Sequence, residues 1–150
     1  MGLEDFRVFL RRHPRVALDS SLFIYHIQKH PKYSPFTSVL FSWIETGRGT
    51  ALTSTLTMTE VLVKPMLEAD EGLAGEFFTL LKRYPNLEWF PVDLPIASVA
   101  ARHRAIFRLR TPDAILSATS VLSGANILIT NDRAFKRVDV LDVLVLDDHL

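Results

Sequence analysis

Short apolar runs alternate along the chain with longer stretches of helical periodicity. Five runs have the length and composition of buried strands, at residues 16–19, 50–55, 87–91, 126–130 and 143–146, the last at a sheet edge. Apolar spacing, capping residues and turn residues predict helices between them. Their ranges are 22–29, 36–46, 57–65, 68–84, 94–109 and 111–123.

Several helices carry more detailed predictions. Ser20 or Ser21 is expected to cap the first helix, Thr111 the last, and Gly124 to end it. One face of 68–84 is expected to hold Leu73, Phe77, Leu80, Leu81 and Tyr84. One side of 94–109 is expected to hold Ile96, Val99, Ala100, His103 and Phe107. The segment SPFTSVLFSWIE is rich in large apolar residues, which favours either core or a partner surface.

Strands that alternate with helices indicate an α/β fold. The crossovers imply a central parallel sheet of about five strands, flanked by helices on both faces. The 150 residues show no repeat or linker, so we expect a single domain over residues 1–150.

Composition bears on the cellular location of the protein and on the kinds of site it can form. Hydrophobic residues make up 48% of the chain, but no apolar run approaches the roughly 20 residues that span a bilayer. The N-terminus makes a poor signal peptide, and the chain has no cysteine. We therefore expect a cytoplasmic protein without a membrane segment, disulfides or thiolate metal sites.

The net charge is zero, yet its distribution is uneven. Residues 97–137 carry a charge of +5 and the rest of the chain carries −5. The basic residues of that stretch are Arg102, Arg104, Arg108, Arg110, Arg133, Lys136 and Arg137. This charge indicates either an ordinary solvated surface or a region that binds nucleic-acid phosphates. In the second case the candidates are Arg104, Arg108 and Arg110, together with Arg133 or Lys136.

Four acids lie where strands end or helices begin: Asp19, Glu60, Asp113 and Asp132. Each has an ordinary alternative explanation, as a helix-start acid, a capping box with Thr57, a first-turn acid and a turn residue, respectively. Those alternatives do not explain why all four fall at the edge where open α/β sheets bind ligands. We expect the fold to bring them together.

Carboxylates alone form a hard oxygen donor set. Such a set suits Mg²⁺ or Mn²⁺, which can orient and activate water for attack on a phosphodiester. The sequence therefore predicts a metal-dependent nuclease site made of these four acids.

Three segments, VALDSSLFIY, LTMTEVLVKP and RLRTPDAILSATSVLSGANILITNDRAFKRV, resemble the PIN-domain family. The chain is most similar to its small VapC-like toxins of type II toxin–antitoxin systems. The resemblance implies a PIN fold, RNA endonuclease activity and Mg²⁺ or Mn²⁺ bound by Asp19, Glu60, Asp113 and Asp132. Thr130 and Asn131 match the polar residues that accompany the last acid, and Ser20 is a further candidate for a supporting residue. An antitoxin partner and a homodimer are also implied.

The match is not complete. Ser21 stands where many members have Asn, and Leu116 where many have His. A housekeeping nuclease that processes rRNA and a non-catalytic binding module are the alternatives within the fold. A phosphoacceptor receiver domain is a third alternative, disfavoured because Asn131-Asp132 occupies the place of its late lysine.

Overall fold

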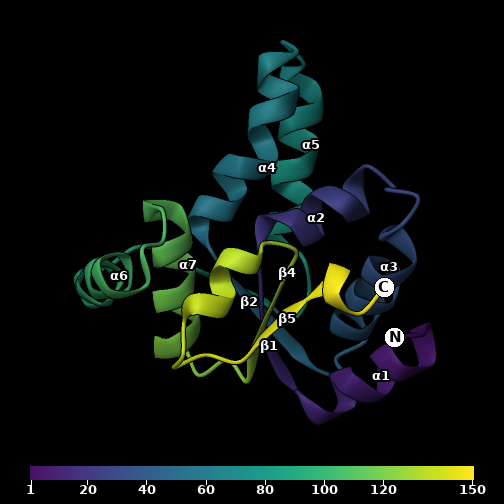
Figure 1. Cartoon of the computed structure of the whole chain (residues 1–150). Helices are drawn as coiled ribbons and strands as arrows, with labels where there is room; N and C mark the ends of the chain where they lie inside the picture. The colour runs from purple at the N-terminus through teal and green to yellow at the C-terminus, as the bar shows by residue number, and fades with distance from the viewer.

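The computed structural model describes residues 1–150 and contains one five-stranded sheet in which every pairing is parallel (Figure 1). The strand order is β3-β2-β1-β4-β5. The strands are β1 (Arg15–Leu18), β2 (Thr50–Ser54), β3 (Leu87–Phe90), β4 (Ile127–Thr130) and β5 (Val143–Val145). The predicted fold class is confirmed, and β5 lies at an edge as expected. Receiver domains have the strand order 2-1-3-4-5, so that alternative is wrong.

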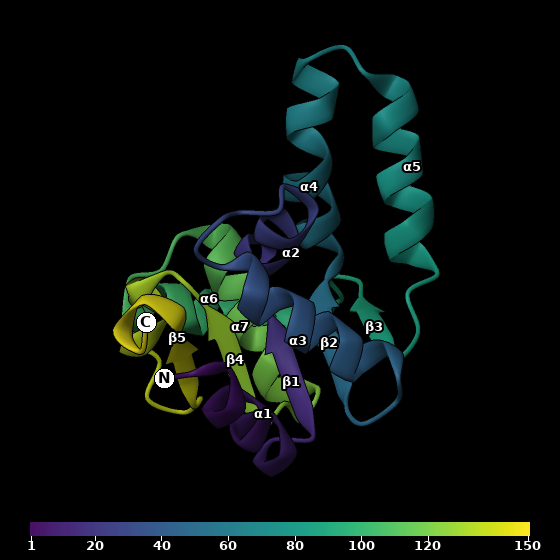
Figure 2. The same cartoon turned by 90° about the vertical axis from the view of Figure 1, so that its right-hand side faces the viewer.

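Helices cover both faces of this sheet (Figures 1 and 2). One layer holds α1 (Leu3–Arg12), α2 (Ser20–Ile27) and α3 (Ser34–Glu45). The other holds α6 (Leu94–Phe107) and α7 (Thr111–Leu122). Two 3₁₀ turns, η1 (Arg133–Arg137) and η2 (Leu146–Asp148), flank β5. No helix is both long and apolar enough to cross a membrane.

Side chains alternate between the two faces of the sheet and so contribute to two separate hydrophobic cores, one on each face. Val16 and Leu18 of β1 face the α1–α3 layer, whereas Ala17 faces α6 and α7. On α6, Ile96 and His103 are buried as predicted. Strands buried on both faces read as continuous apolar runs, which is why these short segments were recognisable in the sequence.

The segment SPFTSVLFSWIE forms α3 and belongs to the core. Leu40 and Ile44 are fully buried, and Trp43 is 7% exposed. Burial therefore excludes the partner-surface interpretation for most of this helix. Helix α1, which packs against α3 through Phe6, was not predicted from the sequence.

Helices α4 (Thr55–Leu67) and α5 (Glu71–Lys82) form a hairpin that extends beyond the sheet (Figure 2). Helix α4 continues through Pro65, because proline near the C-terminal end of a helix removes only one hydrogen bond. Helix α5 begins later than predicted, since Ala69 has φ of 54° and Asp70 caps the helix. Leu80 is 57% exposed, so the apolar face predicted for this helix is buried only in part. In a hairpin of two helices, each helix buries only the narrow stripe of side chains that faces the other.

The turn before β2 leaves no room for a side chain at Gly49. A Cβ atom there would overlap the ring of the buried Trp43. We expect Gly49→Ala to lower the free energy of unfolding by about 1–3 kcal/mol, the usual effect of overpacking. Gly75→Ala, where the added Cβ meets nothing within 4 Å in the middle of α5, is the matched control and should stabilise by about 1 kcal/mol. Urea unfolding of both variants measures the difference, and equal effects would contradict it.

Candidate metal and nuclease site

The candidate site lies at the carboxyl edge of the sheet, where the strand order changes direction. The chain passes from β1 outward to β2 and β3, then returns to place β4 on the other side of β1. Such a switch point is where open α/β sheets bind ligands. Asp19 directly follows β1, and Asp132 follows β4 by two residues.

Asp19 is held by a dense set of hydrogen bonds. Its Oδ1 accepts from the Ser20 backbone N–H at 2.8 Å. Its Oδ2 accepts from the hydroxyls of Thr130 at 2.8 Å and Ser21 at 3.1 Å. Asp19 is thus itself the N-cap of α2, in place of the predicted Ser20 or Ser21. Ser21 was not among the predicted site residues, although two serines directly after a strand-ending acid were a usable signal.

Glu60 approaches Asp19 through Ser20. The Ser20 hydroxyl donates to Glu60 Oε2 at 3.1 Å and lies 3.4 Å from Asp19 Oδ1. The capping-box explanation for Glu60 is wrong, because Ser54 caps α4 and Thr57 is buried against Thr53. Glu60 therefore lies in the second turn of α4 with its carboxylate free of any capping role.

Thr130 links Asp19 to Asp132. The Thr130 hydroxyl accepts from the Asp132 backbone N–H at 3.0 Å while it donates to Asp19. Asp132 Oδ1 caps η1 by accepting from the Ala134 N–H at 2.9 Å. This pair of hydrogen bonds fixes the spacing of the first and fourth acids.

Asp113 lies in the first turn of α7, and its side chain is 14% exposed. Its Oδ2 accepts from Arg110 Nε at 3.3 Å. Arg110 is the N-cap residue of α7, so Thr111 is already helical and does not cap as predicted. Leu116, one turn further, is buried, which indicates a packing role for this departure from the family pattern.

The four acids influence one another electrostatically. Burial raises the pKa of Asp19, and the charge of Asp132 adds to the effect against the opposing hydrogen bonds. Partial desolvation, together with the charges of Asp19 and Asp113, raises the pKa of Glu60. Desolvation also raises the pKa of Asp113, with contributions from Asp132 and Asp19. Carboxylates that destabilise each other's charge form a site that a cation would stabilise.

The donor set fits Mg²⁺ or Mn²⁺, since it consists of carboxylate and hydroxyl oxygens. As the side chains stand, no group of three or more acids or histidines is close enough to hold an ion.

The predicted phosphate-binding arginines form part of the surface beside α7. Arg104 and Arg108 line one shallow cavity on α6, as their spacing predicts. Arg104 also donates to the Leu109 carbonyl at 3.0 Å. Arg133 and Lys136 are engaged elsewhere, because both form ion pairs with Asp148.

Asn131 has contacts away from the acids. Its Nδ2 donates to the hydroxyl of Tyr25 at 3.1 Å and to Asp147 Oδ2 at 3.2 Å. Its Oδ1 accepts from the Asp147 backbone N–H at 2.9 Å. Asp147 also binds Lys32 and Tyr33 through Oδ1 at 2.8 and 2.6 Å. Asn131 thus joins the C-terminal turn to the α2–α3 region, a role that no local sequence signal indicated.

The Asp147 contacts predict a pH-dependent contribution to stability. Hydrogen bonds from Lys32 and Tyr33 lower the pKa of Asp147 to about 2. A lowered carboxyl pKa stabilises the fold above the ordinary value near 3.8, and the effect is lost as pH falls through about 2. Asp147→Asn should therefore be less stable than wild type at pH 7, with the gap closing between these two pH values. Denaturant unfolding across pH, with exposed Asp142→Asn as the control, measures this; a gap that stays constant would contradict it.

A groove of about 340 Å³ adjoins the site. It runs between α2, α4 and α5, and Glu60 lines one end. Its apolar lining includes Ile24, Ile27, Val61 and Phe77. The groove therefore offers an apolar surface continuous with the second acid.

Several solved structures have the same fold. VapBC2 from Rickettsia felis, bound to a DNA fragment from its promoter, has a TM-score of 0.68 at 17% identity, covering 87% of this chain and 97% of that one. A toxin–antitoxin complex from Klebsiella pneumoniae has 0.65 at 20%, covering 86% and 95%. FitAcB from Neisseria gonorrhoeae has 0.65 at 16%, covering 90% and 99%. At these identities the likeness establishes the fold.

No curated protein matches the sequence. The family model of the PIN domain, by contrast, matches residues 16–141. That range contains β2, β3, β4, all of β1 except its first residue, and all four acids of the site, whereas β5 lies beyond it. The match covers most of the chain, and the protein therefore belongs to the PIN domain family.

Proposed function

We propose that the protein is a metal-dependent endoribonuclease of the VapC toxin type, with Asp19, Glu60, Asp113 and Asp132 as its metal-binding and catalytic acids. The observation that carries this proposal is the switch-point arrangement in which Thr130 binds Asp19 and the backbone of Asp132. Membership of the PIN domain family supports the nuclease class.

The carboxylates would hold Mg²⁺ or Mn²⁺ through oxygen atoms. A bound ion supplies an activated water and stabilises the charge that develops on the cleaved phosphodiester. Asp19 is the anchor, since three donors fix its orientation. Ser20 positions Glu60, and Thr130 positions Asp132. Asn131 would support the site indirectly by fixing the end of β4 against Asp147.

Arg104, Arg108 and Arg110 would hold RNA phosphates beside this site. Arg110 is 78% exposed at its side chain, and its partner Asp113 would turn to the metal when one is bound. Contacts of this kind position the RNA backbone and do not read its sequence.

The groove beside Glu60 supports an antitoxin as the protein partner. An apolar segment of that partner lying between α2, α4 and α5 would end at the edge of the acids and block access to them. Helix-lined grooves are a common docking site for amphipathic segments.

A second groove supports a homodimer. It has a volume of about 560 Å³ and lies on α4, α5 and β3, with Val63, Met66 and Phe78 exposed along it. Exposed apolar surface of this kind marks an interaction site. We expect Met66→Glu to convert the purified protein from dimer to monomer, as measured by light scattering after gel filtration. A monomeric wild type, or a dimer unaffected by the substitution, would contradict this.

The activity is tested directly with a panel of structured RNAs. Mn²⁺ or Mg²⁺ should produce discrete cleavage products, and EDTA should abolish them. Products that persist in EDTA would contradict metal dependence. A protein that binds neither ion and leaves every RNA intact would overturn the proposed function in favour of a binding module.

A further inference from the structure

A second basic surface lies at the opposite edge of the sheet from the four acids. It is a groove of about 770 Å³ between α1, α3 and the turn that precedes β2. Arg7, Arg11 and Arg48 line it, together with the hydroxyls of Ser38 and Ser42. Arg11 lies four residues before β1 and Arg48 two residues before β2, so the groove lies at the amino ends of these strands. Helix α1 lies at this end of the sheet (Figure 2).

The arginines of this groove are available to a ligand. Arg11 and Arg48 are exposed and take part in none of the six ion pairs of the protein. Arg7 pairs at 3.4 Å with Glu4, but both side chains are exposed, at 48% and 74%. Exposed pairs contribute little, so an anion can displace Glu4. Three guanidinium groups in one concavity therefore lack a strong internal partner.

The polar groups repeat along the groove. Arg7 and Arg11 are one turn apart on α1, and Ser38 and Ser42 are one turn apart on α3. Four residues of α-helix advance about 6 Å. The guanidinium groups of α1 and the hydroxyl groups of α3 thus repeat at intervals of about 6 Å along the groove, as donors to a chain of anionic groups.

We infer that this groove binds the phosphodiester backbone of single-stranded RNA. Guanidinium forks and hydroxyls are donors suited to phosphate oxygens. Of the apolar residues that line the groove, Leu10 and Trp43 are buried and Val39 is partly exposed, so binding would depend mainly on the polar groups. Reading the bases of a duplex takes an element inserted into one of its grooves, which this concave surface does not present, so a single strand suits it better.

The groove lies partly outside the matched family region, because α1 forms one of its walls. The PIN domain match begins at residue 16, after α1, so Arg7 and Arg11 lie outside it. The choice of RNA as ligand rests on the proposed function, while the presence of an anion-binding groove does not. A site on this side would hold RNA that extends beyond the acids and so favour longer substrates.

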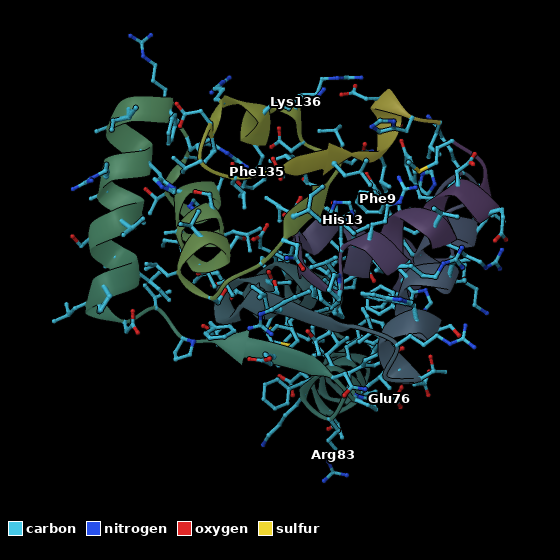
Figure 3. The ribbon with its side chains drawn as sticks, turned by 90° about the horizontal axis from the view of Figure 1, so that it is seen from below. Phe9, His13, Glu76, Arg83, Phe135 and Lys136 are labelled. Atoms are coloured by element: carbon cyan, nitrogen blue, oxygen red, sulfur yellow. The ribbon has the colours of Figure 1, made fainter.

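The test measures binding without cleavage. A fluorescein-labelled unstructured RNA is titrated with the full chain in EDTA, over a series of NaCl concentrations. The groove variant is Arg7→Gln/Arg11→Gln/Arg48→Gln, and the control Arg12→Gln/Lys29→Gln/Arg83→Gln changes the charge equally outside the groove. Arg83 points outward from the end of α5, away from α1 (Figure 3). Thermal melting checks that both variants fold.

Loss of three phosphate contacts should weaken binding about tenfold and flatten the slope of log affinity against log salt by about 2, because each single-strand contact contributes about 0.7. Ser42→Glu, which leaves the arginines in place, should also weaken binding. Equal behaviour of the groove and control variants would overturn the inference. So would stronger competition by duplex DNA or by an acidic peptide than by unlabelled RNA. Since EDTA prevents metal-dependent cleavage, failure of the nuclease proposal would leave this result unchanged, and the reverse also holds.

Discussion

Asp19→Asn is expected to abolish metal-dependent RNA cleavage, with a loss of at least about a hundredfold. Substitution of groups that merely orient metal ligands costs 10–100-fold in affinity or activity, and Asp19 is proposed to bind the ion directly. Asparagine keeps the size of the side chain but removes the negative charge. The fold should persist, because Asp19 Oδ1 and Oδ2 accept hydrogen bonds that an amide oxygen can retain in part.

Two further variants sharpen this comparison. Ser21→Ala removes one of the hydroxyls that donate to Asp19 and should reduce cleavage about tenfold, as expected of a supporting contact. Glu76→Gln removes an acid on the exposed surface of α5 and should leave cleavage unchanged (Figure 3). Initial rates at saturating Mn²⁺ measure all three variants. If Asp19→Asn cleaves like Glu76→Gln, Asp19 is a helix cap and the assignment is wrong.

The placement of the acids could be predicted because it follows from the sheet. Asp19 and Asp132 come after apolar runs that could only be strands, and parallel strands end at one edge. Asp113 was placed by Pro112, which marks a helix start. The hydrogen bonds that join these acids were harder to predict from the sequence. That Thr130 binds Asp19 depends on β1 and β4 being neighbours, which no local pattern reveals.

Elements outside the sheet were harder to predict. Helix α1 was missed although Phe6 and Leu10 repeat at helical spacing between acids in its first turn and arginines in its last, so its amphipathic pattern was a usable signal. The start of α4 was misplaced because Thr57 and Glu60 imitate a capping box, whereas Ser54 at the end of β2 caps the helix. The Asp147 contacts join residues more than a hundred positions apart, and only the folded chain brings them together.

Asp113→Asn should raise the melting temperature of the metal-free protein while it removes cleavage. The pKa of Asp113 is raised, so its charged form is less favourable in the folded state than in the unfolded state at neutral pH. Removal of the charge relieves that penalty, and its loss of interaction with the α7 dipole is the smaller effect. A gain of about 1 kcal/mol corresponds to about 2–4 °C for a domain of this size. Metal-free wild type should likewise gain stability as pH is lowered from neutral toward the ordinary pKa of the carboxyl group.

Mn²⁺ should reverse the order of the two proteins. An ion at a hundred times its dissociation constant stabilises the folded state by about 2.7 kcal/mol, or about 5–10 °C here. The variant, which lacks one ligand, should gain much less. Glu76→Gln should follow wild type with and without the ion. A metal-free Asp113→Asn that melts below wild type would instead identify Asp113 as a helix-start residue, because only the dipole interaction would then have been lost. The proposed site would in that case consist of Asp19, Glu60 and Asp132.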